Sequence, residues 1–185
     1  KYMSKNTYKV LAVEPNSTAI AIAKSKGIKT FSCLKNVPPM ESFNVITLWH
    51  VLEHVSNLKK TLGELRSRLE KNGKLIIAVP NLNSFDSQYY QSHWAALDVP
   101  RHLWHFTTPG IQILMKEAGF VMSHKYPLWF DAIYIAYLSE QNLGNNWPLL
   151  RGSFIGFISN LKAFFSGEYS SLIYVFEEEF SFLED

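Results

Sequence analysis

Short apolar runs and longer segments of helical period alternate along the first half of the chain. The runs are rich in β-branched and aliphatic residues, which is typical of buried strands. They lie at 9–13, 28–34, 43–48 and 74–79. Between the first two, residues 17–26 are rich in Ala and Ile and end at Gly27, where a left-handed residue can stop a helix. This alternation predicts a parallel α/β arrangement.

A second helix is expected after the third run, with Ser56 or Asn57 as its cap. Its apolar residues recur at helical spacing and form one stripe. The stripe consists of Leu58, Leu62, Leu65 and Leu69. Asn72 and Gly73 are expected to end this helix before the next strand.

The second half of the chain continues the pattern. Thr108 followed by Pro109 is typical of a helix start. Further elements are expected as a strand at 120–126, helices at 130–143 and 154–165, and a last strand at 170–176. We therefore expect one α/β domain over 1–185 with a mostly parallel sheet, helices on both faces, and a helical insertion or lid at 128–167 before the last strand.

Chemically capable side chains follow the strand at 43–48 directly. In open α/β sheets, ligands bind beyond the carboxyl ends of the strands, so Trp49, His50, Glu53 and His54 stand where a site is expected. The run from His50 to His54 also fits the H-x-x-E-H pattern of zinc hydrolases. That mechanism needs both histidines on one continuous helix, whereas these lie between a strand and a later cap. Zinc hydrolysis is therefore an alternative, beside a structural role for His54 bonded to a backbone carbonyl.

A long segment without clear periodicity, 82–106, carries an unusual density of polar and aromatic side chains. Loops of this length in compact domains are commonly functional. Its notable residues are Trp94, Asp98, Arg101, His102, Trp104 and His105. They either form part of a site or hold the loop against the sheet.

Composition narrows the function classes. The chain of 185 residues has a formal charge of +2 without a basic block, so no nucleic-acid partner is indicated. Its single cysteine, Cys33, excludes an internal disulfide, and a reducing cytoplasm is the expected location. Aromatic residues make up 15%, which suggests apolar surface kept for a ligand or partner. The apolar face of 154–165 suits core packing, a lid, a homodimer interface or contact with a membrane surface.

Four ordered motifs together resemble a class I S-adenosylmethionine-dependent methyltransferase, of the small-molecule type related to ubiquinone-biosynthesis methyltransferases. They are VLAVEP at 10–15, SFNVITLWHVLEHV at 42–55, GKLIIAVPN at 73–81 and DVPRHLWHFT at 98–107. The resemblance covers about 8–126, and SSLIYVFEEE is similar to the last strand of the same fold. It implies a Rossmann-like methyltransferase fold and S-adenosylmethionine as cofactor.

The resemblance also implies roles for individual residues. Glu14, at the end of the first strand, would hold the cofactor ribose, which its position as an acid at a strand tip also favours. The remaining cofactor contacts would be Ser32, Cys33 and Leu34 beside the adenine, and Trp49 and His50 beside the methionine portion.

The acceptor would be a small molecule, bulky and partly apolar if Trp94, Trp104, Trp129 and Trp147 form its walls. Residues expected at the acceptor are Glu53, Asn81, Trp94, Asp98 and Arg101. Arg101 would suit an anionic group, and His102 or His105 could take a proton from the nucleophile. No metal is required for such transfer.

One feature of the family pattern is not found in the chain. The glycine-rich loop that approaches the methionine end of the cofactor would precede Lys1, and Lys1 itself resembles the end of the following helix. We therefore expect roughly 30 or more additional residues upstream, the size of a strand–loop–helix unit. A methyltransferase-like domain that binds a ligand or partner without turnover is the alternative to an enzyme.

Overall fold

A computed structural model describes residues 8–179 of the chain. Two compact units divide it, Lys1–Ser42 and Phe43–Asp185. The helix end expected at Lys1 and the last residues of the acidic tail lie outside the described residues.

The first unit is a small strand–helix–strand element. Strand β1 (Leu11–Val13) pairs in parallel with β2 (Lys29–Phe31), and helix α2 (Ser17–Ser25) connects them, followed by the short helix η1 (Leu34–Asn36). Asn16, rather than Ser17 or Thr18, caps α2, because its side-chain oxygen accepts a hydrogen bond from the backbone N–H of Ala19 at 3.0 Å. Gly27 has the left-handed φ of 76° that its position at the helix end predicted.

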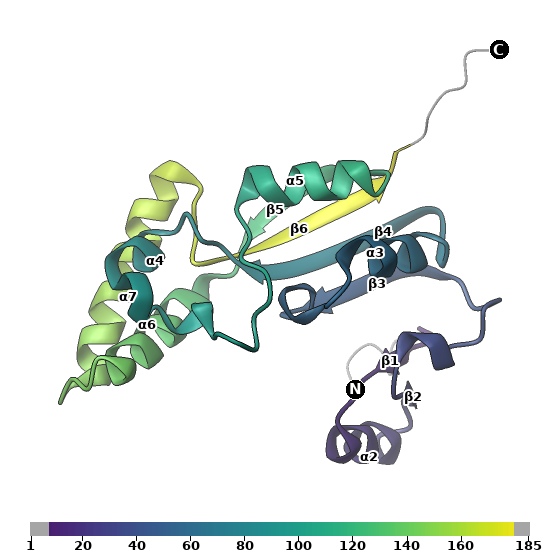
Figure 1. Cartoon of the computed structure of the whole chain (residues 1–185), viewed down its shortest axis with the longest axis horizontal. Helices are drawn as coiled ribbons and strands as arrows, with labels where there is room; N and C mark the ends of the chain where they lie inside the picture. The colour runs from purple at the N-terminus through teal and green to yellow at the C-terminus, as the bar shows by residue number, and fades with distance from the viewer. Residues whose placement is uncertain (1–7, 180–185) are drawn as a thin grey trace, which may run out of the picture. The chain divides into compact units, whose positions relative to one another are not determined.

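The second unit contains a four-stranded sheet in the order β3-β4-β6-β5. The strands are β3 (Phe43–Trp49), β4 (Leu69–Pro80), β5 (Phe120–Pro127) and β6 (Ser171–Glu178). Strands β3, β4 and β5 point in the same direction, and β6, which lies between β4 and β5, is antiparallel to both of them, as the arrowheads in Figure 1 show. The expected common direction therefore holds for three of the four strands of this unit, and the exception is β6, which the chain lays between β4 and β5 after the helical insertion.

Helix α3 (Leu58–Arg66) ends earlier than its leucine spacing indicated. The side chain of Asn57 caps it, as one of the two expected caps. Leu69 belongs to β4 rather than to the helix, and the backbone N–H of Phe43 donates to the carbonyl of Arg68 at 2.8 Å. The residues after Arg68 therefore pair with β3 although their spacing fits a helix. In the strand their backbone N–H and C=O groups have hydrogen-bond partners on β3, which a longer helix would remove.

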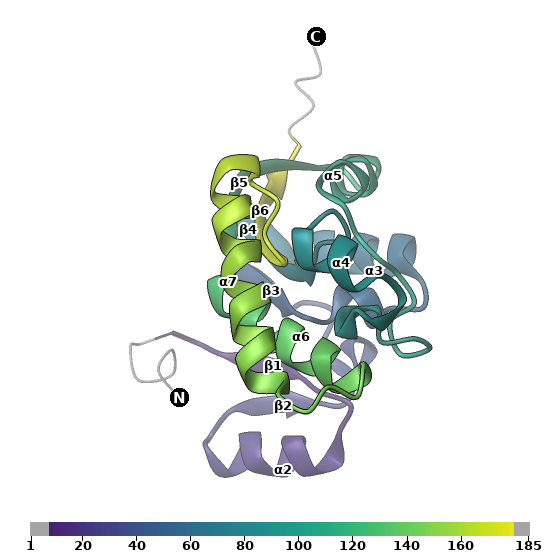
Figure 2. The same ribbon diagram turned by 90° about the vertical axis from the view of Figure 1, so that its left-hand side faces the viewer.

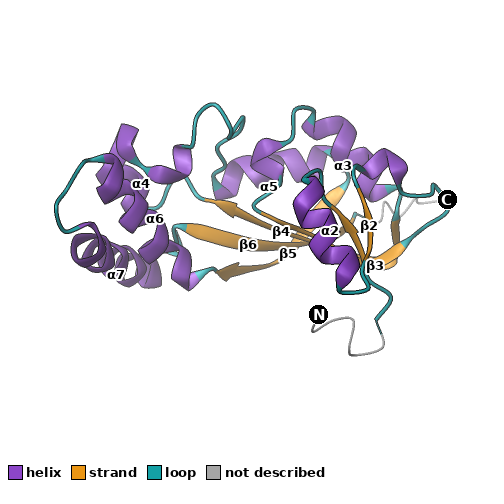
Figure 3. Cartoon of the chain, turned by 90° about the horizontal axis from the view of Figure 1, so that it is seen from below, coloured by secondary structure: helices purple, strands orange, loops and turns teal. Residues whose placement is uncertain are grey.

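Helices α3 and α5 (Thr108–Glu117) lie along one face of this sheet (Figures 1 and 3). Thr107, one residue before the expected cap, accepts a hydrogen bond from the backbone N–H of Gly110. Aliphatic side chains of both helices and of β4 are buried. Fully buried members are Leu62, Leu75, Ile77, Ile111 and Met115.

The helical insertion before the last strand consists of α6 (Trp129–Asn142) and α7 (Pro148–Ser166), which pack side by side in Figure 2. Glycines make the close approach possible. A Cβ added at Gly152 would lie 2.5 Å from the Cα of Tyr137, and one at Gly156 would lie 2.6 Å from the Cα of Ile133. The backbones therefore meet at positions where no larger residue fits.

The apolar side chains of α7 that the sequence analysis placed on one face point outward. Phe154, Phe157, Leu161 and Phe165 are exposed, and Ile158 is partly exposed. Core packing is therefore the wrong interpretation for most of this face, since the small residues of α7 form its buried side. Contact with a second copy or a membrane surface stays a prediction. In 8–179, no helix has the length and apolarity needed to cross a bilayer.

Replacing Gly152 with Ala is expected to destabilise the protein by about 1–3 kcal/mol, because the added methyl group meets backbone atoms that cannot rotate away. Gly63 of α3 has no atom within 4 Å of an added Cβ, so Gly63→Ala is the matched control. It should be neutral or stabilising by about 0.5–1 kcal/mol, as for a helical glycine replaced by alanine. Thermal unfolding followed by circular dichroism measures both, and equal melting temperatures for the two variants would contradict the close packing of α6 on α7.

Candidate functional site

The chain turns sharply where β3 ends. His50 has a left-handed φ of 50°, and its backbone N–H still donates to the carbonyl of Ala78 in β4 at 2.9 Å. The short helix η2 (Leu52–His54) follows at once. Leu52 is fully buried and Glu53 is 1% exposed, so the turn carries an acidic side chain into the interior at the carboxyl end of the strand.

Both ring nitrogens of His50 face carboxylates. Its Nδ1 lies 3.3 Å from Oε1 of Glu53, and its Nε2 lies 3.0 Å from Oδ2 of Asp131 in the first turn of α6. Asp131 first, and Glu53 second, raise the pKa of His50 to about 9, while partial burial opposes this rise. His50 is therefore an imidazolium at neutral pH and joins the turn after β3 to the insertion.

The segment after β4 folds over this turn. The expected loop 82–106 contains short helices, namely α4 (Phe85–Tyr90), η3 (Gln91–His93) and η4 (Ala95–Leu97). Beyond η4, the backbone N–H of Leu103 donates to the carbonyl of Glu53 at 2.8 Å. The indole N–H of Trp104 donates to the carbonyl of Val55 at 2.7 Å. These bonds hold the segment against η2.

Three side chains converge where the segment meets η2. We call Glu53, His54 and His102 the Glu53 cluster, and their ligand-type atoms lie within 4.8 Å of one another. The Nε2 of His102 is 4.0 Å from Oε1 of Glu53, and the rings of His54 and His102 contact edge to face with centroids 4.7 Å apart. His54 is bonded to a backbone carbonyl, that of Arg101, at 2.9 Å. This confirms its expected structural bond, and it leaves the other ring nitrogen for a second contact.

Arg101 and His105 lie beside the cluster but are differently engaged. The Nε and Nη2 of Arg101 donate to Oδ1 of Asp98 at 3.0 and 2.7 Å, while the arginine side chain remains largely exposed. The Nε2 of His105 is 2.9 Å from the carbonyl oxygen of Leu97. A shallow crevice borders these residues, and it is lined by Pro80, Leu82, Trp94, Ala96, His102, Trp104, His105 and Phe106.

Two residues expected at the acceptor have internal partners instead. Asn81 is 1% exposed, and its Nδ2 donates to Glu168 and to the carbonyl of Tyr169. Trp94 is 2% exposed and its indole N–H donates to Oδ2 of Asp86 at 2.8 Å. Both side chains join the end of the sheet to neighbouring segments, so their hydrogen-bonding atoms are not free for a ligand.

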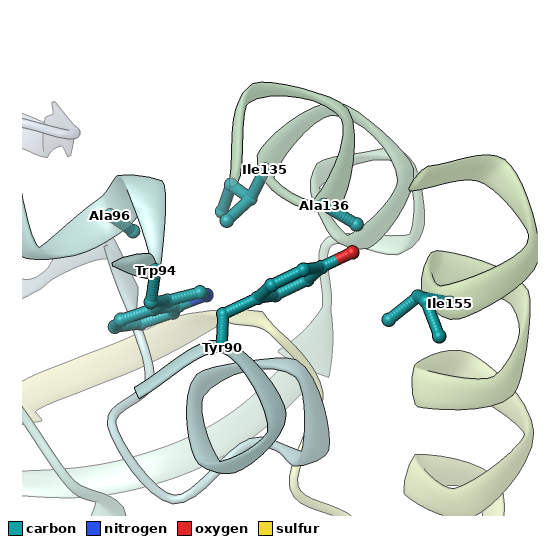
Figure 4. Packing of buried hydrophobic residues seen from close by; sticks show 6 residues of the cluster. All are labelled: Tyr90, Trp94, Ala96, Ile135, Ala136 and Ile155. Atoms are coloured by element: carbon teal, nitrogen blue, oxygen red, sulfur yellow. The ribbon is translucent and has the colours of Figure 1, made fainter. Parts of the chain in front are cut away.

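The buried carboxylate of Asp86 belongs to a second core between α4, α6 and α7. Besides Trp94, it accepts hydrogen bonds from the hydroxyls of Ser159 at 2.7 Å and Ser170 at 2.6 Å. The buried hydrophobic residues of this second core are Tyr90, Trp94, Ala96, Ile135, Ala136 and Ile155 (Figure 4).

At the edge of this second core, the hydroxyl of Tyr90 donates to the fully buried Glu140 at 2.9 Å. Burial, and then Glu140, raise the pKa of Tyr90. Arg151 and Asn145 also contact this carboxylate. Side chains of α4 and α7 therefore compensate the buried carboxylate of Glu140, and these contacts hold the insertion together.

The first unit carries the remaining expected cofactor residues. Glu14 follows β1 directly, its backbone N–H donates to the carbonyl of Phe31, and its Oε1 accepts from the backbone N–H of Asn16 at 2.8 Å. The carboxylate is therefore oriented at the carboxyl end of a parallel strand. Ser32 and Cys33 are exposed, and the hydroxyl of Ser32 accepts from Asn36.

The sequence did not reveal Asp131 as an ion-pair partner of His50. It lies in an apolar helical segment far along the chain from the motif at His50. The available signal was an acidic residue in the first turn of α6, where the helix dipole favours negative charge. That signal indicates a helix start and does not indicate a partner.

A family model described as a methyltransferase domain matches residues 1–125. The chain belongs to this family of class I S-adenosylmethionine-dependent methyltransferases. Among curated proteins, a ubiquinone biosynthesis O-methyltransferase from Rhodopseudomonas palustris is 28% identical over 137 residues, which cover 67% of this chain and 54% of that protein. The chain thus spans about half the length of this curated relative.

Solved structures show the same fold. A S-adenosylmethionine-dependent methyltransferase from Thermotoga maritima matches with a TM-score of 0.63 and 19% identity, covering 92% of this chain and 73% of that one. A 1,6-didemethyltoxoflavin-N1-methyltransferase from Burkholderia thailandensis, with S-adenosylhomocysteine bound, matches with a TM-score of 0.59 and 13% identity, covering 97% and 65%. These neighbours support a Rossmann-like methyltransferase fold.

An NMR titration of the imidazole signals should give His50 a pKa near 9, and Asp131→Asn should lower it toward the ordinary value of 6.5. Because the folded pKa is the higher one, this ion pair adds stability fully below the unfolded value, and the gain is lost as pH rises through about 9. The melting temperature of the unmodified protein should therefore fall more between pH 7 and 10 than that of Asp131→Asn. Glu117→Gln, which makes the same change of charge on α5, is the control. A His50 pKa that is the same in Asp131→Asn as in the unmodified protein would refute the contact between His50 and Asp131.

Proposed function

We propose that this protein transfers a methyl group from S-adenosylmethionine to an oxygen of a small-molecule acceptor. Family membership supports the class of reaction, and the name of the curated relative indicates O-methylation for that protein. The observation that carries the proposal is the gathering of proton-accepting and anionic side chains at the carboxyl ends of parallel strands. Ligands of open α/β sheets bind at those ends.

Residues of the first unit fit one part of the cofactor. The Glu14 carboxylate is oriented through one oxygen by the backbone of Asn16, and its Oε2 has no hydrogen-bond partner within residues 8–179. A carboxylate in this position accepts hydrogen bonds from ribose hydroxyls. When bound, the cofactor supplies an electrophilic methyl group on a sulfonium. We assign Glu14 to hold the ribose, with the exposed Ser32 to Leu34 segment beside the adenine.

At the second unit, Trp49 offers an exposed aromatic surface at the end of β3, being 50% exposed. Its indole suits contact with the methionine portion of the cofactor, because an aromatic face attracts a cationic sulfonium. His50 is assigned a different role from the one first expected. Both its ring nitrogens are engaged by carboxylates, so it orients the turn rather than donating to the cofactor.

The Glu53 cluster is the proposed place where the acceptor loses its proton. The Nδ1 of His102 lies 2.8 Å from the carbonyl oxygen of Ala96, which can only accept, so this nitrogen carries the hydrogen. The neutral ring then has its lone pair at Nε2, on the side of Glu53. Arg101 at the exposed edge suits an anionic group on the acceptor. Methyl transfer itself needs mainly close approach and in-line alignment of acceptor and sulfonium.

The zinc-hydrolase alternative does not agree with the backbone. His50 is in the left-handed region and η2 begins only at Leu52, so His50 and His54 are not on one helix. A binding domain without turnover has no specific structural observation in its favour. The following two experiments separate it from an enzyme.

Calorimetry on the polypeptide as its gene encodes it should detect binding of S-adenosylmethionine and of S-adenosylhomocysteine. Glu14→Gln should weaken binding about 10-fold or more, since a hydrogen bond to a charged acceptor contributes roughly 1.5–3 kcal/mol. Glu41→Gln removes the same charge from the same unit and should leave affinity nearly unchanged, because Glu41 pairs with Lys9 and Lys29. Absence of cofactor binding by the unmodified protein would remove the methyltransferase proposal.

Transfer of a tritiated methyl group to a panel of hydroxylated small molecules tests the role of the cluster. His102→Ala should lower kcat about 100-fold or more while cofactor affinity stays the same, because it removes proton transfer and not binding. His124→Ala, on β5, is the matched loss of a histidine and should retain full activity. Cofactor binding without transfer to any acceptor would favour the non-catalytic domain, and unaltered turnover in His102→Ala would place the chemistry elsewhere.

A further inference from the structure

Asp98 lies between two residues to which the proposed function gives separate tasks. It follows the short helix η4 directly, and its side chain is partly buried. Its Oδ1 accepts hydrogen bonds from Nε and Nη2 of Arg101 at 3.0 and 2.7 Å. Its Oδ2 lies 3.8 Å from Nε2 of His102. The two oxygens of one carboxylate therefore face the proposed anion-binding residue and the proposed proton acceptor.

The backbone at Asp98 makes this double contact possible. Asp98 has a left-handed φ of 39°, and its carbonyl accepts the backbone N–H of His102 at 2.9 Å. The bond closes a turn from Asp98 to His102, which brings the side chains of Arg101 and His102 back to the carboxylate. Aspartate and asparagine adopt the left-handed region more readily than most residues. An aspartate at this position therefore suits both the backbone and the two contacts.

Arg101 is held by Asp98 along one edge only. Its Nη1 has no hydrogen-bond partner among residues 8–179, and its side chain is 76% exposed. A guanidinium is planar and presents its donors in a fixed fork, so fixing one edge also fixes the direction of the other. An anionic group can then bind at the free edge. An exposed ion pair contributes little to the stability of the fold, so the direction that Asp98 gives to the guanidinium is the main effect of this pair.

His102 needs a negative charge nearby when it takes a proton. Its Nδ1 donates to the carbonyl of Ala96, so a proton from the acceptor arrives at Nε2 and makes the ring an imidazolium. Two carboxylates flank that nitrogen, with Oδ2 of Asp98 at 3.8 Å and Oε1 of Glu53 at 4.0 Å. The same Oε1 of Glu53 already faces the imidazolium of His50. In residues 8–179, Oδ2 of Asp98 has no hydrogen-bond partner, so its charge is directed at His102.

We propose that Asp98 is a positioning residue for methyl transfer, which directs Arg101 toward an anionic group of the acceptor and stabilises the imidazolium of His102. This role rests on the proposed function, because it assumes that His102 takes the proton of an acceptor hydroxyl. In that step the proton moves from the hydroxyl oxygen to Nε2, and the electron pair of the O–H bond stays on the oxygen. Asp98 itself takes no proton and only lowers the energy of the charged ring.

Two substitutions at Asp98 separate its two tasks, and both suit the left-handed backbone. Asp98→Asn keeps an oxygen that accepts from Arg101 and removes the negative charge beside His102. It should lower kcat about 10-fold or more and change the KM of an anionic acceptor less than about threefold, because the lost interaction is made mainly in the transition state. Asp98→Gly removes both contacts, so kcat should fall as far and KM should also rise about 10-fold.

Transfer of a tritiated methyl group to hydroxylated acceptors with and without a carboxylate measures both constants. Arg101→Gln should raise KM about 10-fold for anionic acceptors alone, with kcat retained. Glu117→Gln, the loss of a carboxylate on α5, should retain both constants. Unaltered kcat in Asp98→Asn, or equal KM in Asp98→Asn and Asp98→Gly, would overturn the proposal. So would weaker binding of S-adenosylhomocysteine by Asp98→Asn, because that result would indicate a structural role.

The contacts of Asp98 can also be measured without turnover. In NMR spectra of the unmodified protein and of Asp98→Asn, the Nε–H signal of Arg101 should be protected from exchange with water, and in Asp98→Gly this protection should be lost. The ring signals of His102 should shift in both variants, while those of His124 stay in place. Absence of these changes would overturn the proposal. If the unmodified protein transferred no methyl group although these signals behaved as expected, the proposed function would fall and the contact of Asp98 with Arg101 would stand.

Discussion

The burial of Glu53 is the constraint on which the site depends. A buried carboxylate must be compensated by charge or hydrogen bonds, and the compensation here comes from separate segments. His50 reaches one oxygen from the end of β3, and the ring of His102 approaches from the segment after η4. The carbonyl of Glu53 also receives the backbone N–H of Leu103. One residue therefore fixes the relation between a strand end and a loop far along the chain.

A second buried acid organises the insertion in the same way. Asp86 accepts hydrogen bonds from Trp94, Ser159 and Ser170, which lie on the segment after α4, on α7 and just before β6. These donors come from different elements, and α7 packs on α6 through glycines while most of its large apolar side chains are exposed. The aromatic residues that resembled the wall of an acceptor site are thus divided between this core and the surface.

Local chemistry made much of the fold predictable. Apolar runs marked the strands, and Gly27 and the cap before α3 followed from backbone conformation and side-chain oxygens that act within a few residues. The predictions that failed concern segments whose hydrogen-bond partners are distant in sequence. Leu69 fits a helical stripe but belongs to β4 because β3 pairs with it, and β6 runs against both of its neighbours, which no local pattern in its sequence indicates.

The same distinction applies to the site. The position after a strand singled out Glu53 and His54, and the density of polar side chains in 82–106 singled out His102; the structure brings these three side chains together. Asn81, which also follows a strand, and Trp94, in the same loop as His102, have internal hydrogen-bond partners instead. No residue near Asp131 in the sequence indicated that it would pair with His50.

The backbone at His50 decides which chemistry the motif can support. A spacing of four residues brings two histidines together only on a helix, and a left-handed residue at 50 turns its ring toward α6 instead. The Glu53 carboxylate then has three histidine neighbours, with two different consequences. His50 links it to Asp131 and the insertion, while His54 and His102 link it to whatever the site binds. Because one carboxylate serves both, any change in charge at the cluster acts directly on the ion pair that holds the start of α6.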